Sequence, residues 1–448
     1  MKVTLIGGGS YQWAPNLISD MLQMPSLQQM HLVLEDIDPE PLPLMQKYAT
    51  FAAEQPGANI TVETTTDQRE AVKDAFAVIV CISTGGFASM THDLEVPARH
   101  GIKQSVGDSV GPGGISRALR NIPVLVGIGR DMAELAPDGW LLNITNPMTV
   151  LTRSVRKETG IKAVGLCHEI DTFLWDLCLL SGVPKENIQP VISGVNHFPV
   201  VTQLALGSDD GLQFVRDLIA DDKDDTGEIE EWRSRTKFKE RHALKLRLFE
   251  MYGALPAAGD RHLAEFLPSV LTPESDWGAG YGVHLTTIAE REEHQGQYVE
   301  RVHRLLGGDE PVPTWQSGEM VAPILDSLLT GTPRELPLNM PNAGQADDLP
   351  QDAVVEGFCH VDADGIRARD VVSLPIPLAE VVRRHVVVQE LTVDAAVRGD
   401  RRLALQAMTL DPLAGRGDLS ETAAMLDELL DATAKWLPPS LTRVSGNP

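Results

Sequence analysis

Residues 2–10 read KVTLIGGGS and decide the fold of the N-terminal half of the chain. The first five of these residues form a short, apolar, β-branched run, which predicts a buried strand. Three glycines and a serine follow, and Pro15 then lies near the start of an amphipathic run that extends to about residue 24. A second apolar run, 31–36, ends in acidic residues. Strand, glycine turn, helix, strand and acid occur in this order in dinucleotide-binding folds.

The glycine fingerprint is incomplete, because its third glycine position holds Gln12. The pattern therefore fits either a nucleotide-binding turn or an ordinary tight turn between strand and helix. In a nucleotide site, the pyrophosphate would lie at the helix N-terminus against the backbone amides of Gly7, Gly8, Gly9 and Ser10. The ribose hydroxyls would be accepted by Asp36, for which Glu35 and Asp38 are alternatives.

Strand and helix patterns continue to alternate up to about residue 198. Further strands are predicted at 59–63, 77–82, 140–144, 162–166 and 188–195, which favours an α/β fold with a Rossmann-type, doubly wound parallel sheet. Ser83 and Thr84 follow the central strand, where small residues would let a cofactor approach. The segment 87–114 lacks periodicity and is expected to be a long loop, either a lid or a substrate wall. We expect two domains: residues 1–198 bind the nucleotide, and residues 199–448 form a mixed α/β domain.

Polar side chains follow three of the predicted strands. Asn146 follows strand 140–144, Cys167-His168-Glu169 follows strand 162–166, and Asn196-His197 follows strand 188–195. If the last two strands are neighbours, Cys167 and His197 meet as half of a metal site with open positions for substrate. The alternative is that Cys167 is a small buried apolar residue and His197 a hydrogen-bonded polar one. Ligand softness alone favours zinc or ferrous iron.

A second group of ionisable residues lies in 259–266, GDRHLAEF, which contains Asp260 and His262. Periodicity does not place these two residues. They belong either to a functional site or to a solvated loop.

Composition excludes several classes of protein. The chain has 448 residues and a formal net charge of −25, which argues against a nucleic-acid partner or an anionic membrane surface. The same charge disfavours a strongly anionic substrate unless arginines and lysines gather locally at the site. Four irregularly spaced cysteines, without a signal peptide or spanning segment in the sequence, lead us to expect a cytoplasmic protein.

Five motifs in order resemble those of glycoside hydrolase family 4, the NAD- and divalent-metal-dependent glycosidases. The motifs are Ile6–Ser10 with Pro15, Leu34–Asp38, Ile144–Pro147, Gly165–Glu169 and Gly194–Phe198. The resemblance implies a Rossmann-type NAD domain, a C-terminal domain for substrate binding and oligomerisation, and a homodimer or homotetramer. It also implies a sugar substrate and manganese as the usual metal.

The same resemblance assigns roles to residues. It implies that Cys167 and His197 bind the metal, that Asn146 contacts substrate and that Asp260 is the catalytic base, while His168 or Glu169 is the general acid. The implied chemistry is redox-neutral: oxidation at C3 of the sugar, proton removal at C2, loss of the aglycone, addition of water and return of the hydride.

Within the family, the identity of the residues after the metal-binding cysteine varies with the substrate of each member. A Cys-His-Glu-Val motif marks α-galacturonidases, and this chain has Ile170 in the last position. The resemblance therefore favours an α-galacturonidase. A uronate needs a cation for its carboxylate, and the candidates are Arg99, Arg117, Arg261 and His262, each of which could instead be an ordinary ion-pair partner.

Three other interpretations remain open. Within the family, the chain could be an α-galactosidase or an α-glucosidase. Outside it, an NAD-dependent dehydrogenase of the malate or lactate type has a similar sheet, and a non-catalytic NAD-binding protein would need no metal. Net formation of NADH would identify a dehydrogenase, because a redox-neutral glycosidase leaves NADH unchanged.

Overall fold

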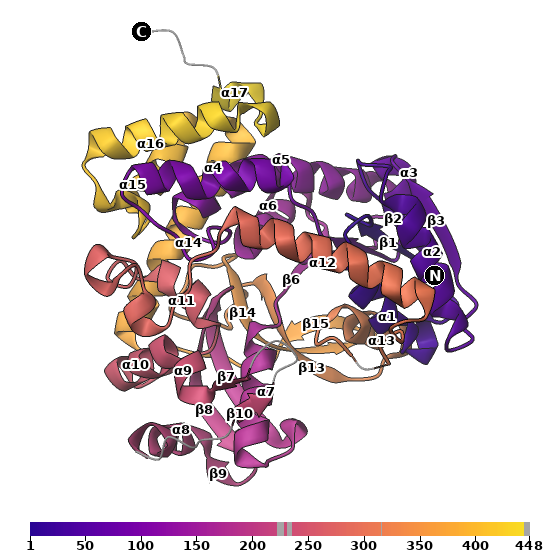
Figure 1. Cartoon of the computed structure of the whole chain (residues 1–448), viewed down its shortest axis with the longest axis horizontal. Coiled ribbons are helices and arrows are strands. Elements are labelled where there is room, and N and C mark those ends of the chain that lie inside the picture. The colour runs from indigo at the N-terminus through magenta and orange to yellow at the C-terminus, as the bar shows by residue number, and fades with distance from the viewer. Residues whose placement is uncertain (222–227, 231–234, 315, 443–448) are drawn as a thin grey trace.

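The computed structural model describes residues 1–221, 228–230, 235–314 and 316–442 (Figure 1). Its centre is a nine-stranded sheet in the order β15-β14-β13-β6-β5-β4-β1-β2-β3. Six neighbouring strands are parallel: β1 (Lys2–Ile6), β2 (His31–Glu35), β3 (Thr61–Thr65), β4 (Ala77–Val80), β5 (Trp140–Asn143) and β6 (Lys162–Leu166). Their spatial order is that of a dinucleotide-binding fold, so the predicted Rossmann-type α/β architecture is confirmed.

Helices cover both faces of the parallel strands. They are α1 (Ala14–Leu22), α2 (Leu42–Glu54), α3 (Gln68–Val72), α4 (Gly86–Arg99), α5 (Gly111–Leu135) and α6 (Met148–Thr159). In β4, Val78 and Val80 join the core that contains α5 and α6, whereas Ala77 and Ile79 join the core that contains α1 and α2. Successive side chains of a strand point to opposite faces, so a strand covered on both sides is apolar throughout.

The second half of the chain adds three antiparallel strands to this sheet. β13 (Arg334–Pro341) pairs with β6, and β14 (Val354–Asp362) and β15 (Gly365–Ala368) follow outward. At the junction, Asn339 of β13 pairs with Gly165 of β6. The sheet is thus shared by residues on both sides of position 198.

Residues 188–195 form a strand, but not in the parallel sheet. β7 (Ile188–Val195) and β8 (Phe198–Leu206) form an antiparallel hairpin in a smaller sheet with β9 (Asp209–Asp210) and β12 (Leu255–Pro256). The prediction that this strand lies beside 162–166 is wrong, because β13 occupies the free edge of β6. The two-residue turn of the hairpin is Asn196-His197, and His197 has a φ of 67°, which lies in the left-handed region.

The predicted loop 87–114 is also wrong in most of its length. Helix α4 covers 86–99, and only 100–110 connects it to α5. Asp93 of α4 is fully buried and accepts hydrogen bonds from the guanidinium of Arg120 in α5, one of them 2.8 Å long. This buried ionic pair interrupts the apolar pattern of α4, which is why periodicity did not reveal the helix.

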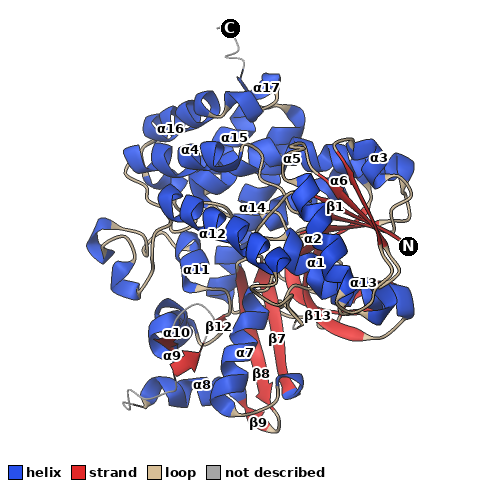
Figure 2. Cartoon of the chain, turned by 45° about the vertical axis from the view of Figure 1, so that its right-hand side comes forward, coloured by secondary structure: helices blue, strands red, loops and turns tan. Residues whose placement is uncertain are grey.

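The remaining elements surround the hairpin and cover the sheet. They are α7 (Glu169–Ser181), α8 (Gly211–Ala220), β10 (Glu228–Glu230), β11 (Arg235–Lys237), α9 (Phe238–Arg241), α10 (Ala243–Tyr252), α11 (Asp260–Phe266), α12 (Ile288–Gly307), α13 (Val321–Thr330), α14 (Ile376–Arg398), α15 (Arg401–Leu410), α16 (Leu419–Ala432) and α17 (Pro439–Thr442). Helix α14 packs against α5 and α6, and α12 reaches from α4 to α2. Figure 2 shows the helical part at one end and the β7–β8 hairpin at the other. Within the described residues, none of the helices combines the length and apolarity needed to cross a membrane.

Candidate active site

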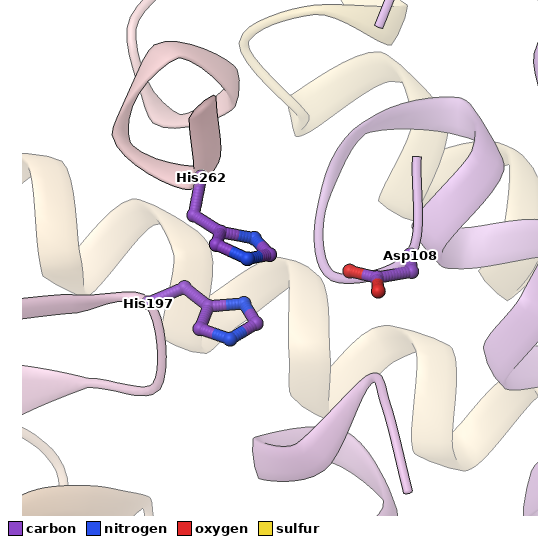
Figure 3. Close-up of side chains that lie close together, drawn as sticks. All are labelled: Asp108, His197 and His262. Atoms are coloured by element: carbon purple, nitrogen blue, oxygen red, sulfur yellow. The ribbon is translucent and has the colours of Figure 1, made fainter. Parts of the chain in front are cut away.

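Three side chains from distant parts of the chain meet beside the start of α5 (Figure 3). They are Asp108 from loop 100–110, His197 from the β7–β8 turn and His262 from α11. One potential ligand atom of each lies within 4.8 Å of those of the other two. Two imidazoles and a carboxylate at this spacing can hold a divalent metal ion.

His197 is held on two sides. Its Nδ1 lies 2.6 Å from Oγ of Ser109, and its ring stacks on that of His262 with 3.6 Å between the centroids. Burial and the neighbouring His262 lower the pKa of His197 to about 3, so its imidazole is neutral near pH 7. A neutral imidazole is the form that binds a metal ion.

The hydrogen bonds of Ser109 define which nitrogen of His197 carries the proton. The Ser109 hydroxyl donates to Oδ1 of Asp108 at 2.7 Å. A hydroxyl has a single proton, so it must accept from Nδ1–H of His197, and the lone pair of the ring then lies on Nε2. Ser109 thus orients the imidazole so that Nε2 could accept a ligand.

Asp108 is an ionised carboxylate. Besides Ser109, its partner is Nδ2 of Asn146, which donates to Oδ2 at 3.3 Å. Burial alone would raise the pKa of Asp108, but the two imidazoles and the guanidinium of Arg117 hold it well below its usual range. The site therefore keeps a fixed negative charge beside His197.

Glu169 joins this group through its contacts with α11. Its Oε2 accepts a hydrogen bond from the backbone N–H of Gly259, and its Oε1 lies 3.9 Å from Nε2 of His262. Burial would raise the pKa of Glu169, but His262 and His168 lower it to about 2. At neutral pH Glu169 is ionised and carries no proton to donate.

Asp260 lies on the same short helix as His262, but its side chain is hydrogen-bonded to the start of α10. Its carboxylate accepts from the backbone N–H groups of Leu244 and Lys245 at 2.7 and 3.1 Å, at the start of α10. Residues two apart on a helix point in different directions, so Asp260 faces α10 while His262 faces His197. Burial raises the pKa of Asp260 to about 6, against the opposing effect of the Lys245 ammonium.

Cys167 is buried at the end of β6 and does not belong to the group of Asp108, His197 and His262. Burial and the carboxylates of Glu356 and Glu169 raise the pKa of Cys167 well above its usual value, while the side chain of Asn196 favours the thiolate. Because Asn196 precedes His197 in the turn, the hairpin brings the His197 segment to Cys167. This approach replaces the predicted one through adjacent parallel strands.

His168 is about two-fifths exposed at the start of α7, and it is paired. Its Nδ1 lies 3.0 Å from Oε1 of Glu319, and its ring centroid is 6.5 Å from that of Trp13. The contact with Trp13 places His168 beside the turn that follows β1.

The predicted substrate residues have different surroundings. Asn146 contacts Asp108, and its Oδ1 is buried without a hydrogen-bond partner among the described residues. A buried, unsatisfied oxygen is costly, so this atom is suited to a bound ligand. Arg99, by contrast, ends α4 and pairs with Glu428 of α16, with Nε to Oε1 at 3.0 Å. No described contact joins Arg99 to the group around His197.

The glycine turn after β1 is shaped by close backbone approaches. A Cβ at Gly7 would lie 2.0 Å from the carbonyl oxygen of Cys81, and one at Gly8 would lie 2.8 Å from Cβ of Leu34. A Cβ at Gly9 would lie 2.8 Å from Oδ2 of Asp36, and that oxygen accepts the Gly9 N–H at 3.0 Å. Ser10 belongs to the same turn, since its N–H donates to the Gly7 carbonyl at 3.1 Å.

Ser83 and Thr84 follow β4, two strands from β2. Thr84 is held in place by Asn121, whose side-chain oxygen accepts its backbone N–H at 3.2 Å. Of the acids considered at the end of β2, Glu35 is buried and burial raises its pKa to about 7. Asp36 is the acid that contacts the glycine turn.

Sequence reasoning did not assign a role to Asp108, Ser109 or Glu319. Asp108 and Ser109 lie in the segment without periodicity, just before GPGG at 111–114. A helix beginning with Gly-Pro after a polar pair is the only signal that points to them. Glu319 has no local signal, because its partner His168 is far away in the sequence.

Comparisons with known proteins give the family. Residues 2–175 match "Family 4 glycosyl hydrolase", and residues 192–414 match "Family 4 glycosyl hydrolase C-terminal domain". The chain is 34% identical to an alpha-galacturonidase of Bacillus subtilis, over 96% of this chain and 97% of that protein. It is 30% identical to an alpha-galactosidase of the same organism, over 98% and 99%.

Solved structures agree. The putative glucosidase lplD of Bacillus subtilis superposes with a TM-score of 0.87 at 32% identity, covering 96% of this chain and 99% of that one. A 6-phospho-alpha-glucosidase from gut microorganisms, solved in complex with NAD and Mn²⁺, has the same fold, with a TM-score of 0.81 at 20% identity and coverage of 98% and 99%. The chain belongs to family 4 of the glycosyl hydrolases.

Proposed function

We propose that this glycosidase hydrolyses α-galacturonides, with NAD⁺ and a divalent metal, manganese in the first place, as cofactors. Support for the sugar comes from the relatives named alpha-galacturonidase and from Cys167-His168-Glu169-Ile170. The observation that carries the chemistry is the meeting of Asp108, His197 and His262 in one buried group. The family also contains an alpha-galactosidase at 30% identity, which is the second candidate.

The glycine turn fits a dinucleotide. Side chains are excluded from Gly7, Gly8 and Gly9 by the close approaches described above, so backbone alone lines this surface. Gly7 to Ser10 would bind the pyrophosphate, Asp36 the ribose, and Ser83 and Thr84 the region nearer the nicotinamide.

The residues around His197 fit a divalent metal ion. The Nε2 of His197 carries a lone pair, and Nδ1 of His262 is buried without a hydrogen-bond partner among the described residues. We keep Cys167 and His197 as the proposed ligands, and Asp108 lies close enough to His197 to add a hard oxygen ligand. Asp108 would supply the hard oxygen donor that suits manganese, whereas Cys167 by itself favours a softer metal ion.

A bound NAD⁺ would supply a hydride acceptor that is regenerated in each turnover, and a bound metal would supply a Lewis acid for the sugar oxygens. Asp260 is the proposed base for the C2 proton, and a pKa of about 6 suits a base at neutral pH. The hydrogen bonds of Asp260 to α10 hold its carboxylate in one orientation. Lys245 is the cation that opposes the rise of this pKa.

Proton donation to the leaving aglycone is assigned to His168 rather than Glu169. Glu169 is ionised at neutral pH, since its pKa is about 2. Nδ1 of His168 lies 3.0 Å from Oε1 of Glu319, and this contact holds the ring of His168 at the start of α7. Asn146 supplies a buried oxygen toward the sugar hydroxyls.

We further propose a homodimer or homotetramer that works in the cytoplasm. The absence of any disulfide among the four cysteines, all described and all free, supports a reducing compartment.

The experiment that tests the proposed function is a substrate panel. p-Nitrophenyl α-galacturonide, α-galactoside and α-glucoside are assayed with NAD⁺ and Mn²⁺, and NADH is followed at the same time. We expect the highest kcat/KM with the α-galacturonide and no net NADH. Preference for the galactoside would select the second candidate, and accumulation of NADH in step with turnover would contradict the redox-neutral route.

A further inference from the structure

Arg291 is a partly buried cation for which the described residues offer no ion-pair partner. It lies in the first turn of α12, and its Nε is buried with no hydrogen-bond partner in the described part of the chain. No carboxylate of the described residues lies within 4.0 Å of its guanidinium, as an ion pair would require. An uncompensated buried charge is destabilising, so proteins keep one mainly where a ligand supplies the opposite charge.

Two further arginines lie in the same region. Arg117 of α5 donates from Nε to the carbonyl oxygen of Asn146 at 3.0 Å. Arg261 of α11 donates to the carbonyl oxygens of His284 and Ser105 at 3.1 and 3.2 Å. Both bond to neutral oxygens, and neither has an ion-pair partner among the described residues.

Hydrogen bonds connect these arginines to the candidate active site. The backbone N–H of Thr286, just before α12, donates to the carbonyl oxygen of Ser105 at 2.9 Å. Ser105 begins the short segment that ends at Asp108, and Asp108 contacts Asn146, the partner of Arg117. The start of α12, the Asp108 loop and Asn146 are therefore neighbours at one end of the site.

Among the described residues of this region, the three arginines face two ionised carboxylates, Asp108 and Glu290, and the pKa of Glu290 is lowered to about 2 by its hydrogen bonds to Thr287. Burial lowers the pKa of Arg117 and of Arg261, and Arg291 lowers both further by repulsion. Asp108 is the ionised carboxylate that they share, and it is also engaged by two imidazoles. Burial raises the pKa of Glu265 to about 8, so Glu265 adds no negative charge at pH 7.

We propose that Arg291, together with Arg117 and Arg261, binds the C6 carboxylate of the sugar. The inference rests on the proposed α-galacturonidase function and names the residues that would bind the negatively charged group of the substrate. A planar guanidinium matches a carboxylate with two parallel hydrogen bonds, which the neutral hydroxymethyl group of a galactoside cannot accept in the same way. The local excess of arginines also lets a chain of net charge −25 attract an anionic substrate.

The test uses the full-length enzyme with NAD⁺ and Mn²⁺. Arg291→Gln removes the positive charge. Arg291→Lys keeps the charge but lacks the planar guanidinium that can donate two parallel hydrogen bonds. Arg304→Gln is the matched control, because Arg304 lies on the same helix, about half exposed, and contacts Glu310 at 3.4 Å. kcat and KM are measured for p-nitrophenyl α-galacturonide, α-galactoside and α-glucoside 6-phosphate, and binding of free galacturonate and galactose is measured by calorimetry.

For Arg291→Gln we expect the ratio of kcat/KM for galacturonide over galactoside to fall about 100-fold, mainly through KM. Arg291→Lys should lie between the wild type and Arg291→Gln, and Arg304→Gln should keep the wild-type ratio. Galacturonate binding should weaken in parallel, which reports on the site even if a variant turns over slowly.

Several results would overturn this assignment. An unchanged ratio in Arg291→Gln, an equal loss for both sugars, or an equal shift in Arg304→Gln would each show that Arg291 does not read the carboxylate. A wild-type preference for the 6-phosphate would assign the arginines to a phosphate instead. If the wild type does not hydrolyse the galacturonide at all, the proposed function itself fails, and that result is separable because it precedes any variant.

Discussion

The Oγ of Ser109 lies 2.6 Å from Nδ1 of His197, although 88 positions separate the two residues in the chain. This contact joins the loop before α5, in the dinucleotide-binding half, to the tip of the β7–β8 hairpin. It connects the part of the chain that carries the glycine turn to the hairpin that carries His197.

Replacing Ser109 by alanine should weaken metal binding. Without the hydroxyl, nothing fixes the proton of His197 on Nδ1, and the Nε2 lone pair is no longer held toward the ion. Loss of such an orienting group costs roughly 10–100-fold in metal affinity. Titration of the protein with Mn²⁺, followed by electron paramagnetic resonance, measures the effect. Ser109→Thr keeps a hydroxyl and is the control; equal affinities of the alanine and wild-type proteins would show that Ser109 does not orient His197.

Replacing Cys167 by serine should lower activity with Mn²⁺ by a factor of about 100 or more, because a hydroxyl is a poor substitute for a thiolate ligand. Wild-type activity should also fall with mild oxidants and recover with thiols. Cys178→Ser, on the partly buried face of α7, serves as the control and should behave as wild type. Near-normal turnover of Cys167→Ser would remove Cys167 from the metal site.

A side chain at position 259 is predicted to fit only if Glu169 moves away from it. The backbone angles of Gly259 are ordinary, but a Cβ would lie 2.7 Å from Oε2 of Glu169. Gly259→Ala should therefore destabilise the protein by about 1–3 kcal/mol and displace Glu169 from His262. Gly296→Ala, on the exposed face of α12 with no atom within 4 Å of the new Cβ, should instead stabilise by about 0.5–1 kcal/mol. Thermal and denaturant unfolding distinguish the two, and equal effects would contradict the steric explanation.

Stability should depend on pH through Glu265. This fully buried carboxyl accepts the backbone N–H groups of Val106 and Gly107, both at 2.7 Å, and burial raises its pKa to about 8. Between the ordinary pKa of a glutamate and pH 8, the folded state holds a proton that the unfolded state has lost. The free energy of unfolding therefore falls as the pH rises through this window, by roughly 1.4 kcal/mol per pH unit.

Glu265→Gln cannot ionise and should remove this slope. Wild type should thus lose stability relative to the variant between pH 5 and pH 8, as measured by denaturant unfolding. Glu292→Gln, on the exposed side of α12, is the control. Parallel curves for wild type and Glu265→Gln would show that Glu265 does not hold the proton.

The sequence was informative where structure is local. The apolar runs of β1, β2, β4, β5 and β6 and the glycine turn at 7–9 define the parallel sheet, because strands covered on both faces must be apolar and a tight turn needs glycines. Asn146, Glu169 and His197, which follow predicted strands, also occur together, and His262 joins them from a segment that periodicity did not place.

The errors concern long-range pairing. β7 was placed beside β6 because nothing near residue 188 shows that β13, some 145 residues later, takes that edge. Asp108 was given no role because the buried Asp93–Arg120 pair interrupts the apolar pattern of α4. Without that pattern, the whole segment 87–114 was predicted to be a loop. Arg291 has the pattern of a solvated charge on an amphipathic helix, and only the fold shows that its Nε is buried.

The most direct measurement of the central claim is hydrolysis of p-nitrophenyl α-galacturonide in D₂O, with NAD⁺ and Mn²⁺ present and the product analysed by proton magnetic resonance. Removal and replacement of the C2 proton predict a galacturonate that carries deuterium at C2, with no net NADH. Product with hydrogen retained at C2 would contradict the account.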